Sequence, residues 1–270
     1  MKGMIRRLAL VGIAGLMASC LAEPVSITIL RVAPVNLDSC EVEVGSGGDS
    51  VGLARGLLDV AIAQSYVVHP VVQNNMYDVR GVNGFSEPDG RTQTTDVLLT
   101  EAVVELSTFD VLNANLPPRR VVPFVTNVNL NSISAVGVEV LDAAMIEAIR
   151  QSPQFLTVNA QSQVKALRTT MTIVATIKYR GHTVGGAEVE SNTVNFPITL
   201  CNGCSVYYPP SADTGGESSP NCSGGADEEL PEITCPSQVG TDGFSVHCLQ
   251  CPGFAIDSFS RQLCEPPQGI

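Results

Sequence analysis

The stretch TMTIVATIKY, residues 170–179, is the clearest strand in the sequence, because apolar residues recur at every second position. Successive side chains of an extended chain point to opposite faces, so every second residue shares a face. One face then carries Met171, Ile173, Ala175, Ile177 and Tyr179. The other carries Thr170, Thr172, Val174, Thr176 and Lys178. We predict a strand here, followed by a turn at residues 180–183.

Further strand-like segments lie on both sides of this stretch. They are rich in β-branched residues and are separated by turn-forming Gly, Pro, Asn and Asp. Pro197 lies in the last of them and places it at an edge or a bulge, since proline cannot donate to an inner ladder. The predicted strands fall within residues 25–31, 57–72, 95–106, 186–189 and 193–200.

One segment has helical rather than strand periodicity. Between residues 140 and 149 apolar side chains recur at spacings of three and four, and Ser152-Pro153 ends the pattern. Many short strands with one short helix are typical of an antiparallel, immunoglobulin-like β-sandwich. We therefore predict a mainly all-β domain over residues 21–200. The alternative is a split near residue 117 into two small sandwiches.

The last 70 residues, 201–270, differ in composition from the rest. They are rich in Gly, Ser, Pro and Cys, and they hold nine acidic residues against one basic residue, Arg261. We predict an irregular, acidic, disulfide-rich tail, with a flexible loop at 208–232 and a small cross-linked unit at 241–270. The net charge of −12 for the whole chain argues against a nucleic-acid partner, because no basic stripe is present.

The chain has nine cysteines, an odd number. If Cys20 is modified, eight remain, which suits four disulfides in an oxidising compartment. Seven of the eight lie in the tail, so full pairing requires Cys40 to be joined to it. The connectivity is otherwise open. The eight candidates are Cys40, Cys201, Cys204, Cys222, Cys235, Cys248, Cys251 and Cys264.

The N-terminal residues have the features of a secretory signal. Lys2, Arg6 and Arg7 precede an apolar run at residues 8–18, which is too short to span a bilayer. Met17-Ala18-Ser19-Cys20 then resembles the lipobox of bacterial lipoproteins. That resemblance implies that residues 1–20 are a signal peptide, that Cys20 carries lipid, and that the lipid anchors the chain to the membrane. The alternative is an ordinary signal cut after Ala22 and a secreted product.

Localisation within the envelope follows from the next residue. Leu21 stands where Asp acts as the inner-membrane retention signal in this family, so the resemblance favours the outer membrane.

A second resemblance covers roughly residues 50–204. It rests on the strings LLDVA with SY at 57–66, GGAEVES at 185–191 and NFPITLCNGC at 195–204. Together they resemble a group of uncharacterised exported proteins from myxobacteria and their relatives. The resemblance implies a β-sandwich that ends in a Cys-x-x-Cys pair. It implies no activity.

Two Cys-x-x-Cys pairs are the strongest chemical motifs: Cys201 with Cys204, and Cys248 with Cys251. In a reducing compartment they would suggest tetrahedral zinc, which needs thiolates. In an exported chain we expect disulfides, and redox chemistry is the third interpretation. A thioredoxin-like site would place the pair at a helix N-terminus, whereas strand residues precede Cys201.

Other candidates for chemistry carry little signal. The three histidines, His69, His182 and His247, are far apart in sequence. We interpret each as a surface histidine or as one whose hydrogen bonds are satisfied, and not as part of a site. Residues 45–48 lack the lysine of a phosphate-binding loop. The acidic run at 227–229 with Glu232 fits no calcium-loop spacing and is interpreted as a solvated charge run.

We therefore expect a non-enzymatic envelope lipoprotein, without a cofactor, that binds or scaffolds another envelope protein or a surface polysaccharide. One alternative is a zinc-binding module in the tail that uses Cys201, Cys204, Cys248 and Cys251. The other is a hydrolase whose site is assembled from scattered loop residues.

Overall fold

The computed structural model describes residues 26–45, 51–76, 94–108, 116–158, 164–209, 222, 230 and 232–266. The predicted signal peptide with Cys20, and the acidic run at 227–229, lie outside the described residues. Most of the predicted loop at 208–232 does as well. Among the described residues, no helix is long and apolar enough to cross a membrane.

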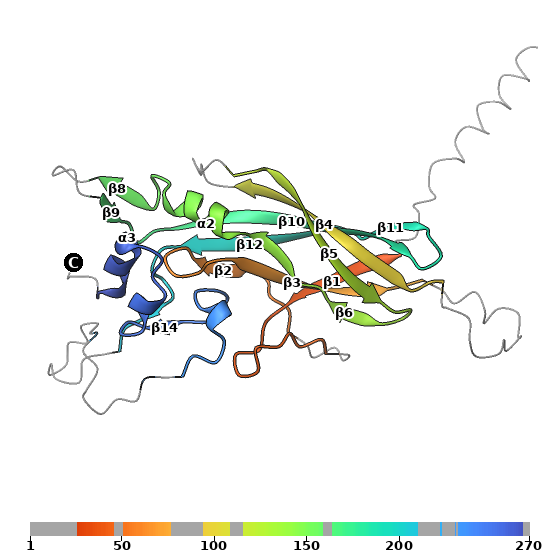
Figure 1. Ribbon diagram of the computed structural model, residues 1–270, viewed down its shortest axis with the longest axis horizontal. Helices are drawn as coiled ribbons and strands as arrows, with labels where there is room; N and C mark the ends of the chain where they lie inside the picture. Colours follow the sequence, from red (N-terminus) through yellow and green to blue (C-terminus); the bar gives the residue numbers. More distant parts are fainter. Residues whose placement is uncertain are drawn as a thin grey trace, which may run out of the picture.

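The largest sheet of the fold is mixed, has six strands and is curved into a half-barrel (Figure 1). Its order is β2 (Gly56–Asp59), β12 (Val194–Cys201), β10 (Thr170–Thr183), β4 (Val97–Thr108) and β5 (Arg119–Val128). A short strand, β11 (Glu188–Glu190), also pairs with β10. All these pairs are antiparallel except β12 with β2, which is parallel.

A second, antiparallel sheet packs against the first. It contains β1 (Ile27–Ala33), β3 (Tyr66–Asn74) and β6 (Ile133–Ala135), and β7 (Val138–Leu141) also pairs with β3. One cluster of buried side chains includes members of both sheets, so the main core lies between them. The mainly β class is confirmed. The immunoglobulin-like sandwich is not shown, because the large sheet is mixed and forms a half-barrel.

The remaining elements are short. One small antiparallel sheet joins β8 (Leu156–Val158) to β9 (Val164–Ala166). A parallel one joins β13 (Val206–Tyr207) to β14 (Val246–His247). In the described ranges the helices are α2 (Ala143–Arg150) and α3 (Ser258–Arg261), with single 3₁₀ turns η2 (Pro236–Gln238), η3 (Cys251–Gly253) and η4 (Gln262–Cys264).

The stretch at residues 170–179 forms most of β10, the strand at the centre of the large sheet. The five side chains of the predicted apolar face are all buried. The predicted turn at 180–183 is wrong, because β10 continues to Thr183 and the turn comes at residues 184–186. A β-bulge between Arg180 and Gly181 allows this continuation while β10 stays paired with β4.

Gly181 is required by the close approach of β4. A Cβ atom added there would lie 2.1 Å from the carbonyl oxygen of Leu98 and 2.8 Å from the Cα atom of Leu99. We expect Gly181→Ala to lower the free energy of unfolding by about 1–3 kcal/mol, the usual cost of overpacking. Denaturant titration measures the loss. Gly253→Ala is the control, because nothing lies within 4 Å of the added Cβ. Equal effects would contradict the assigned contact.

The helical periodicity at residues 140–149 is only partly a helix. Val140 and Leu141 belong to β7, whose alternating sequence pairs with β3, and α2 begins at Ala143. Asp142 sets this boundary, because its side chain accepts the N–H of Met145 at 2.9 Å as an N-cap. The predicted end near Ser152-Pro153 agrees with the last helical residue, Arg150.

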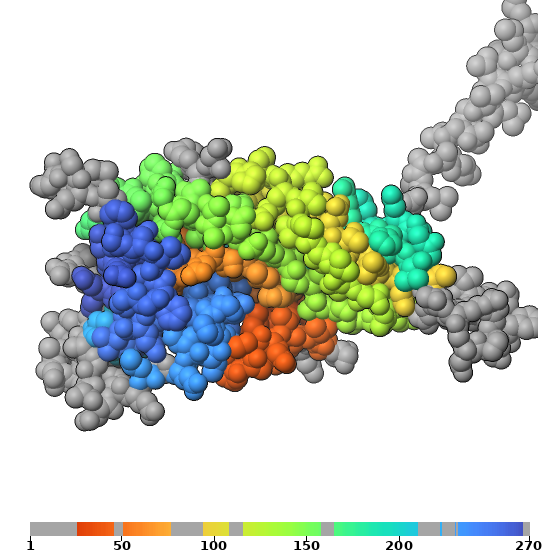
Figure 2. Space-filling model, viewed as in Figure 1, coloured from red at the N-terminus to blue at the C-terminus, as the bar shows by residue number. Residues whose placement is uncertain are grey.

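The tail is packed on the free edge of β2. Backbone N–H groups of Asp59 and Asp242 donate to the carbonyls of Gly240 and Leu57 at 2.7 and 2.9 Å. A small second core joins tail residues such as Val246 to residues after β2 such as Ile62. Figure 2 shows the blue tail lying against the orange and red segments near the N-terminal part of the fold. The cross-linked region therefore has apolar burial as well as disulfides.

Candidate functional site at the Cys201–Cys204 disulfide

The structure joins eight cysteines in four disulfides. The bonds are Cys40–Cys235, Cys201–Cys204, Cys222–Cys248 and Cys251–Cys264. The first ties Cys40 to the tail across 195 residues of sequence, which is the link that the parity of the cysteines requires. Because the chain has nine cysteines, only Cys20 is left outside these bonds.

The two Cys-x-x-Cys motifs do not form one zinc site. Cys201 and Cys204 are bonded to each other, whereas Cys248 and Cys251 are bonded to Cys222 and Cys264. A thiolate is needed to bind zinc, and a sulfur in a disulfide is not a thiolate. The four cysteines of the zinc interpretation are therefore divided among three disulfides.

Cys201 and Cys204 instead lie beside the carboxyl group of Asp59. One carboxylate oxygen and the two Sγ atoms all lie within 4.8 Å of one another. Within the described ranges, this is the one group of three or more His, Cys, Asp or Glu side chains gathered this closely. Asp59 ends β2, and the parallel register of β2 with β12 sets it opposite Cys201.

The carboxylate of Asp59 organises the backbone around the disulfide. It accepts N–H bonds from Gly203 at 2.8 Å, Ser205 at 2.8 Å and Ala61 at 3.1 Å. The first two hold the Cys-x-x-Cys loop, and the third holds the chain where it leaves β2. Residues 60–65 accordingly form a turn and bend, although the sequence favoured a continuous β-rich stretch there.

Asp59 is completely buried, and burial raises the pKa of its carboxyl group above the ordinary value of 3.8. The three N–H donors and the guanidinium of Arg168 oppose this shift, because they stabilise the charged form. The site therefore contains a buried acid beside a disulfide, and its protonated form is favoured relative to an acid in water.

The two cysteines of the loop differ in exposure. Cys201 is the last residue of β12 and is fully buried, whereas Cys204 is exposed. Between them, Gly203 adopts a positive φ of 77°, which favours glycine. A Cβ atom on Gly203 would also lie 2.9 Å from the Cβ of Leu263, so the loop fits closely against the tail.

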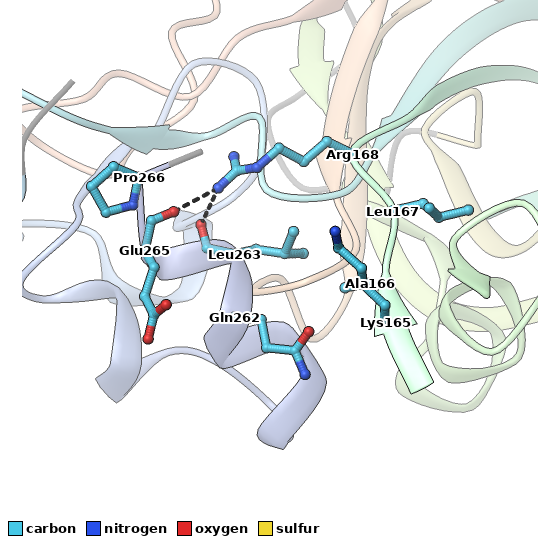
Figure 3. Close-up of a pocket in the computed structure, with 8 residues that line it drawn as sticks. All are labelled: Lys165, Ala166, Leu167, Arg168, Gln262, Leu263, Glu265 and Pro266. Atoms are coloured by element: carbon cyan, nitrogen blue, oxygen red, sulfur yellow. Dashed lines mark hydrogen bonds between the residues drawn. The ribbon is translucent and has the colours of Figure 1, made fainter. Parts of the chain in front are cut away.

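Arg168 connects this loop to the end of the tail. Its guanidinium donates to the carbonyl oxygens of Gly203 at 3.1 Å and of Leu263 and Glu265 at 2.9 Å each. It also lies 5.5 Å from the centre of the Tyr208 ring. Figure 3 shows Arg168 reaching across a pocket of about 500 Å³ toward the tail carbonyls. The pocket is lined by Lys165, Arg168, Gln262, Leu263, Glu265 and Pro266, among others.

The three histidines lie on different strands. His69 is on β3 and His182 on β10, while the buried His247 on β14 accepts the N–H of Leu249 at Nδ1. Burial lowers the pKa of His69. Within the described residues, none of the three joins the metal-type grouping found at Asp59. Glu232 is exposed, and the acidic residues that precede it lie outside the described residues.

Comparison with known proteins does not assign the chain to a family. No family model, no curated protein and no solved structure matches the chain. The resemblances to lipoproteins and to exported myxobacterial proteins accordingly stay predictions.

Sequence reasoning identified Cys201 and Cys204 but missed Asp59 and Arg168. One signal for Asp59 is present: it is the only charged residue in the apolar run LLDVAIA at 57–63. A charged side chain in such a run is either on a solvated face or buried with partners. Arg168 carries no comparable signal, because its acceptors come from residues 35 to 97 positions away.

Proposed function

We propose that this chain is an exported envelope protein, anchored to the membrane by lipid on Cys20, with a non-enzymatic structural or binding role. The observation that supports it is the pairing of the cysteines. Four disulfides occupy eight of the nine, so every other cysteine of the chain is already bonded and Cys20 has no intramolecular cysteine partner. Four disulfides also suit an extracytoplasmic compartment. A lipid thioether at Cys20 resolves the odd count.

A structural role is supported by how firmly the tail is held. Besides the Cys40–Cys235 bond, the carboxylate of Asp242 accepts bonds from the Leu57 N–H and the Tyr66 hydroxyl at 2.8 Å each. The buried guanidinium of Arg150 pairs with Asp257 at 3.1 Å. Covalent, polar and apolar contacts thus hold the tail and the sheets together as one scaffold.

For the partner, the exposed strand β5 favours a protein over a polysaccharide. β5 is an edge of the large sheet, and Val121 and Val125 on it are 49% and 73% exposed. An edge strand offers unpaired backbone groups to another chain, and apolar side chains add burial on contact. We propose another envelope protein as the partner, at the outer membrane.

The lipid anchor is tested by metabolic labelling with palmitate. We expect the wild-type chain to be labelled and to sediment with membranes, and Cys20→Ala to lose both properties. Ser19→Ala is the matched control, because it keeps the cysteine and should keep the label. Equal labelling of wild type and Cys20→Ala would contradict the proposal. A soluble, unlabelled wild type cut after Ala22 would favour the secreted alternative.

A further inference from the structure

We propose that the Cys201–Cys204 disulfide is a redox site that exchanges with a protein dithiol, with Cys204 as the attacked sulfur and Asp59 as the proton donor to Cys201. This inference goes beyond the proposed function, which assigns no chemistry to this pair. It does not depend on the lipid anchor, because it concerns Cys201 and Asp59, the C-terminal residues of β12 and β2, and the loop that follows β12.

We infer the direction of attack from the exposure of the two cysteine residues. Thiol–disulfide exchange requires a thiolate to reach one sulfur and the other to leave. Cys204 is exposed and Cys201 is fully buried, so an incoming thiolate meets Cys204 and expels Cys201. The buried Cys201 is then sheltered from other reactants until it closes the bond again.

Access alone does not distinguish this disulfide, and the chain supplies an internal control. The Cys40–Cys235 bond also joins an exposed to a buried cysteine. Its sulfurs lie near backbone carbonyls, with Sγ of Cys40 3.2 Å from the oxygen of Thr234 and Sγ of Cys235 3.4 Å from that of Leu37. In the described part of the chain, no grouping of acidic or histidine side chains like that at Asp59 surrounds it.

Asp59 places a carboxyl group beside Cys201–Cys204, and the Cys40–Cys235 bond has no such group in the described part of the chain. A thiolate expelled from Cys201 would be a charge buried in the protein interior, which is costly unless it is neutralised. A carboxyl oxygen of Asp59 lies within 4.8 Å of that sulfur. The raised pKa of this carboxyl group favours the protonated form that can give up a proton. The other charged or titratable groups acting on it are Arg168 and Tyr208, and Arg150 donates to the adjacent Val60 carbonyl.

Arg168 supplies a positive charge beside the loop. It is bonded to the Gly203 carbonyl, between the two cysteines in sequence. A cation near a cysteine favours the thiolate over the thiol, which assists both its departure and its attack.

The exchange has two steps. A thiolate of the partner protein bonds to Sγ of Cys204, the bond between the two Sγ atoms breaks, and Cys201 keeps the electron pair and takes the proton of Asp59. A second thiolate of the partner then bonds to the partner sulfur in the mixed disulfide, and Cys204 leaves as a thiolate. The partner has been oxidised to a disulfide, and Cys201–Cys204 has been reduced to a dithiol. Asp59 regains a proton that the partner thiols released. Reverse exchange with a small-molecule disulfide restores the bond.

Selective reduction of the native chain tests the site. The full exported chain is incubated without denaturant in glutathione buffers, free thiols are alkylated, and peptides are mapped over time. We expect Cys201 and Cys204 to be reduced about tenfold faster than Cys40 and Cys235. Reduction of Cys40–Cys235 at an equal or greater rate would overturn the proposal.

A matched pair of variants tests which sulfur is attacked. Cys201→Ser and Cys204→Ser break the same bond, so both lose the same cross-link. With oxidised glutathione, Cys201→Ser should form a mixed disulfide at Cys204, and Cys204→Ser should form little at the buried Cys201. Equal mixed-disulfide formation in the two folded variants would contradict the proposed direction.

The role of Asp59 is tested by the pH profile of the reduction rate. We expect Asp59→Asn to slow the reduction of Cys201–Cys204 about tenfold and to flatten its pH dependence. Asp242→Asn is the control, because Asp242 is a half-buried acid whose pKa is also raised by burial but which accepts bonds from Leu57 and Tyr66 instead. An unchanged profile in Asp59→Asn would overturn the proton-transfer role. If that variant does not fold, the selective reduction and the matched cysteine variants still decide whether Cys201–Cys204 exchanges and which sulfur is attacked, and a wild-type reduction rate without a pH dependence would overturn the role of Asp59.

Discussion

Replacing both Cys40 and Cys235 with alanine will lower the free energy of unfolding by about 5 kcal/mol. The bond between them spans 195 residues, the longest separation among the four disulfides. In the chain-entropy description, a cross-link stabilises by restricting the unfolded state, and longer loops gain more. Denaturant titration of the oxidised wild type and the variant, with linear extrapolation to water, measures the loss.

The Cys251→Ala/Cys264→Ala double variant is the comparison for that measurement. This bond spans 13 residues, for which the same description gives about 3 kcal/mol. Both of its cysteines are buried, whereas Cys40 is exposed. Loss of local packing would therefore make the shorter bond the more costly one to remove. A larger loss for the shorter bond would show that packing, and not loop entropy, dominates.

The part of the fold that could be predicted is the part that local periodicity determines. In β10 the alternation of residues 170–179 places five apolar side chains on one face, and all five are buried in the structure. The odd number of cysteines required a link from Cys40 to the tail, and the Cys40–Cys235 bond provides one. Neither prediction depends on which segments of the chain are neighbours in the folded structure.

The errors arise where a distant segment changes the local outcome. The sequence Arg-Gly-His-Thr at 180–183 has turn chemistry, but the close approach of β4 at Gly181 keeps it in the sheet. Val140 and Leu141 fit a helical spacing, but they lie in β7, which pairs with β3, and Asp142 caps the helix later. In both places a tertiary partner outweighs a local preference.

The same reasoning explains why Asp59 could not be recognised as part of the site. Its two loop donors, Gly203 and Ser205, are 144 and 146 residues away in sequence. They reach Asp59 because β2 pairs in parallel with the end of β12, and a parallel pair cannot be inferred from a local pattern. The lone acid in an apolar run indicated a special position without indicating its partners.

Asp59→Ala will be the most damaging single substitution at this site, with a loss of about 3 kcal/mol or more in the free energy of unfolding. The change leaves the N–H groups of Ala61, Gly203 and Ser205 without their acceptor in a buried place, and each such group costs about 1–3 kcal/mol. Asp142→Ala is the graded control. Its carboxylate caps one N–H, that of Met145, and the usual cost of losing a cap is about 1 kcal/mol. It also pairs with the guanidinium of Arg120 at 3.1 Å, a partly exposed ion pair that adds about 0–1 kcal/mol.

The pH dependence of that loss shows whether burial, which raises the pKa of Asp59, or its hydrogen bonds, which lower it, has the larger effect. Burial raises the folded-state pKa of Asp59 above 3.8, so the folded chain holds this proton more tightly than the unfolded chain does. The resulting stabilisation is fully present below the unfolded pKa and disappears as the pH rises through the folded pKa. The difference between wild type and Asp59→Ala should therefore be largest below pH 3.8 and smaller at neutral pH. A difference that grows with pH would mean that the three N–H bonds outweigh burial and lower the pKa, so that Asp59 stays ionised beside the disulfide.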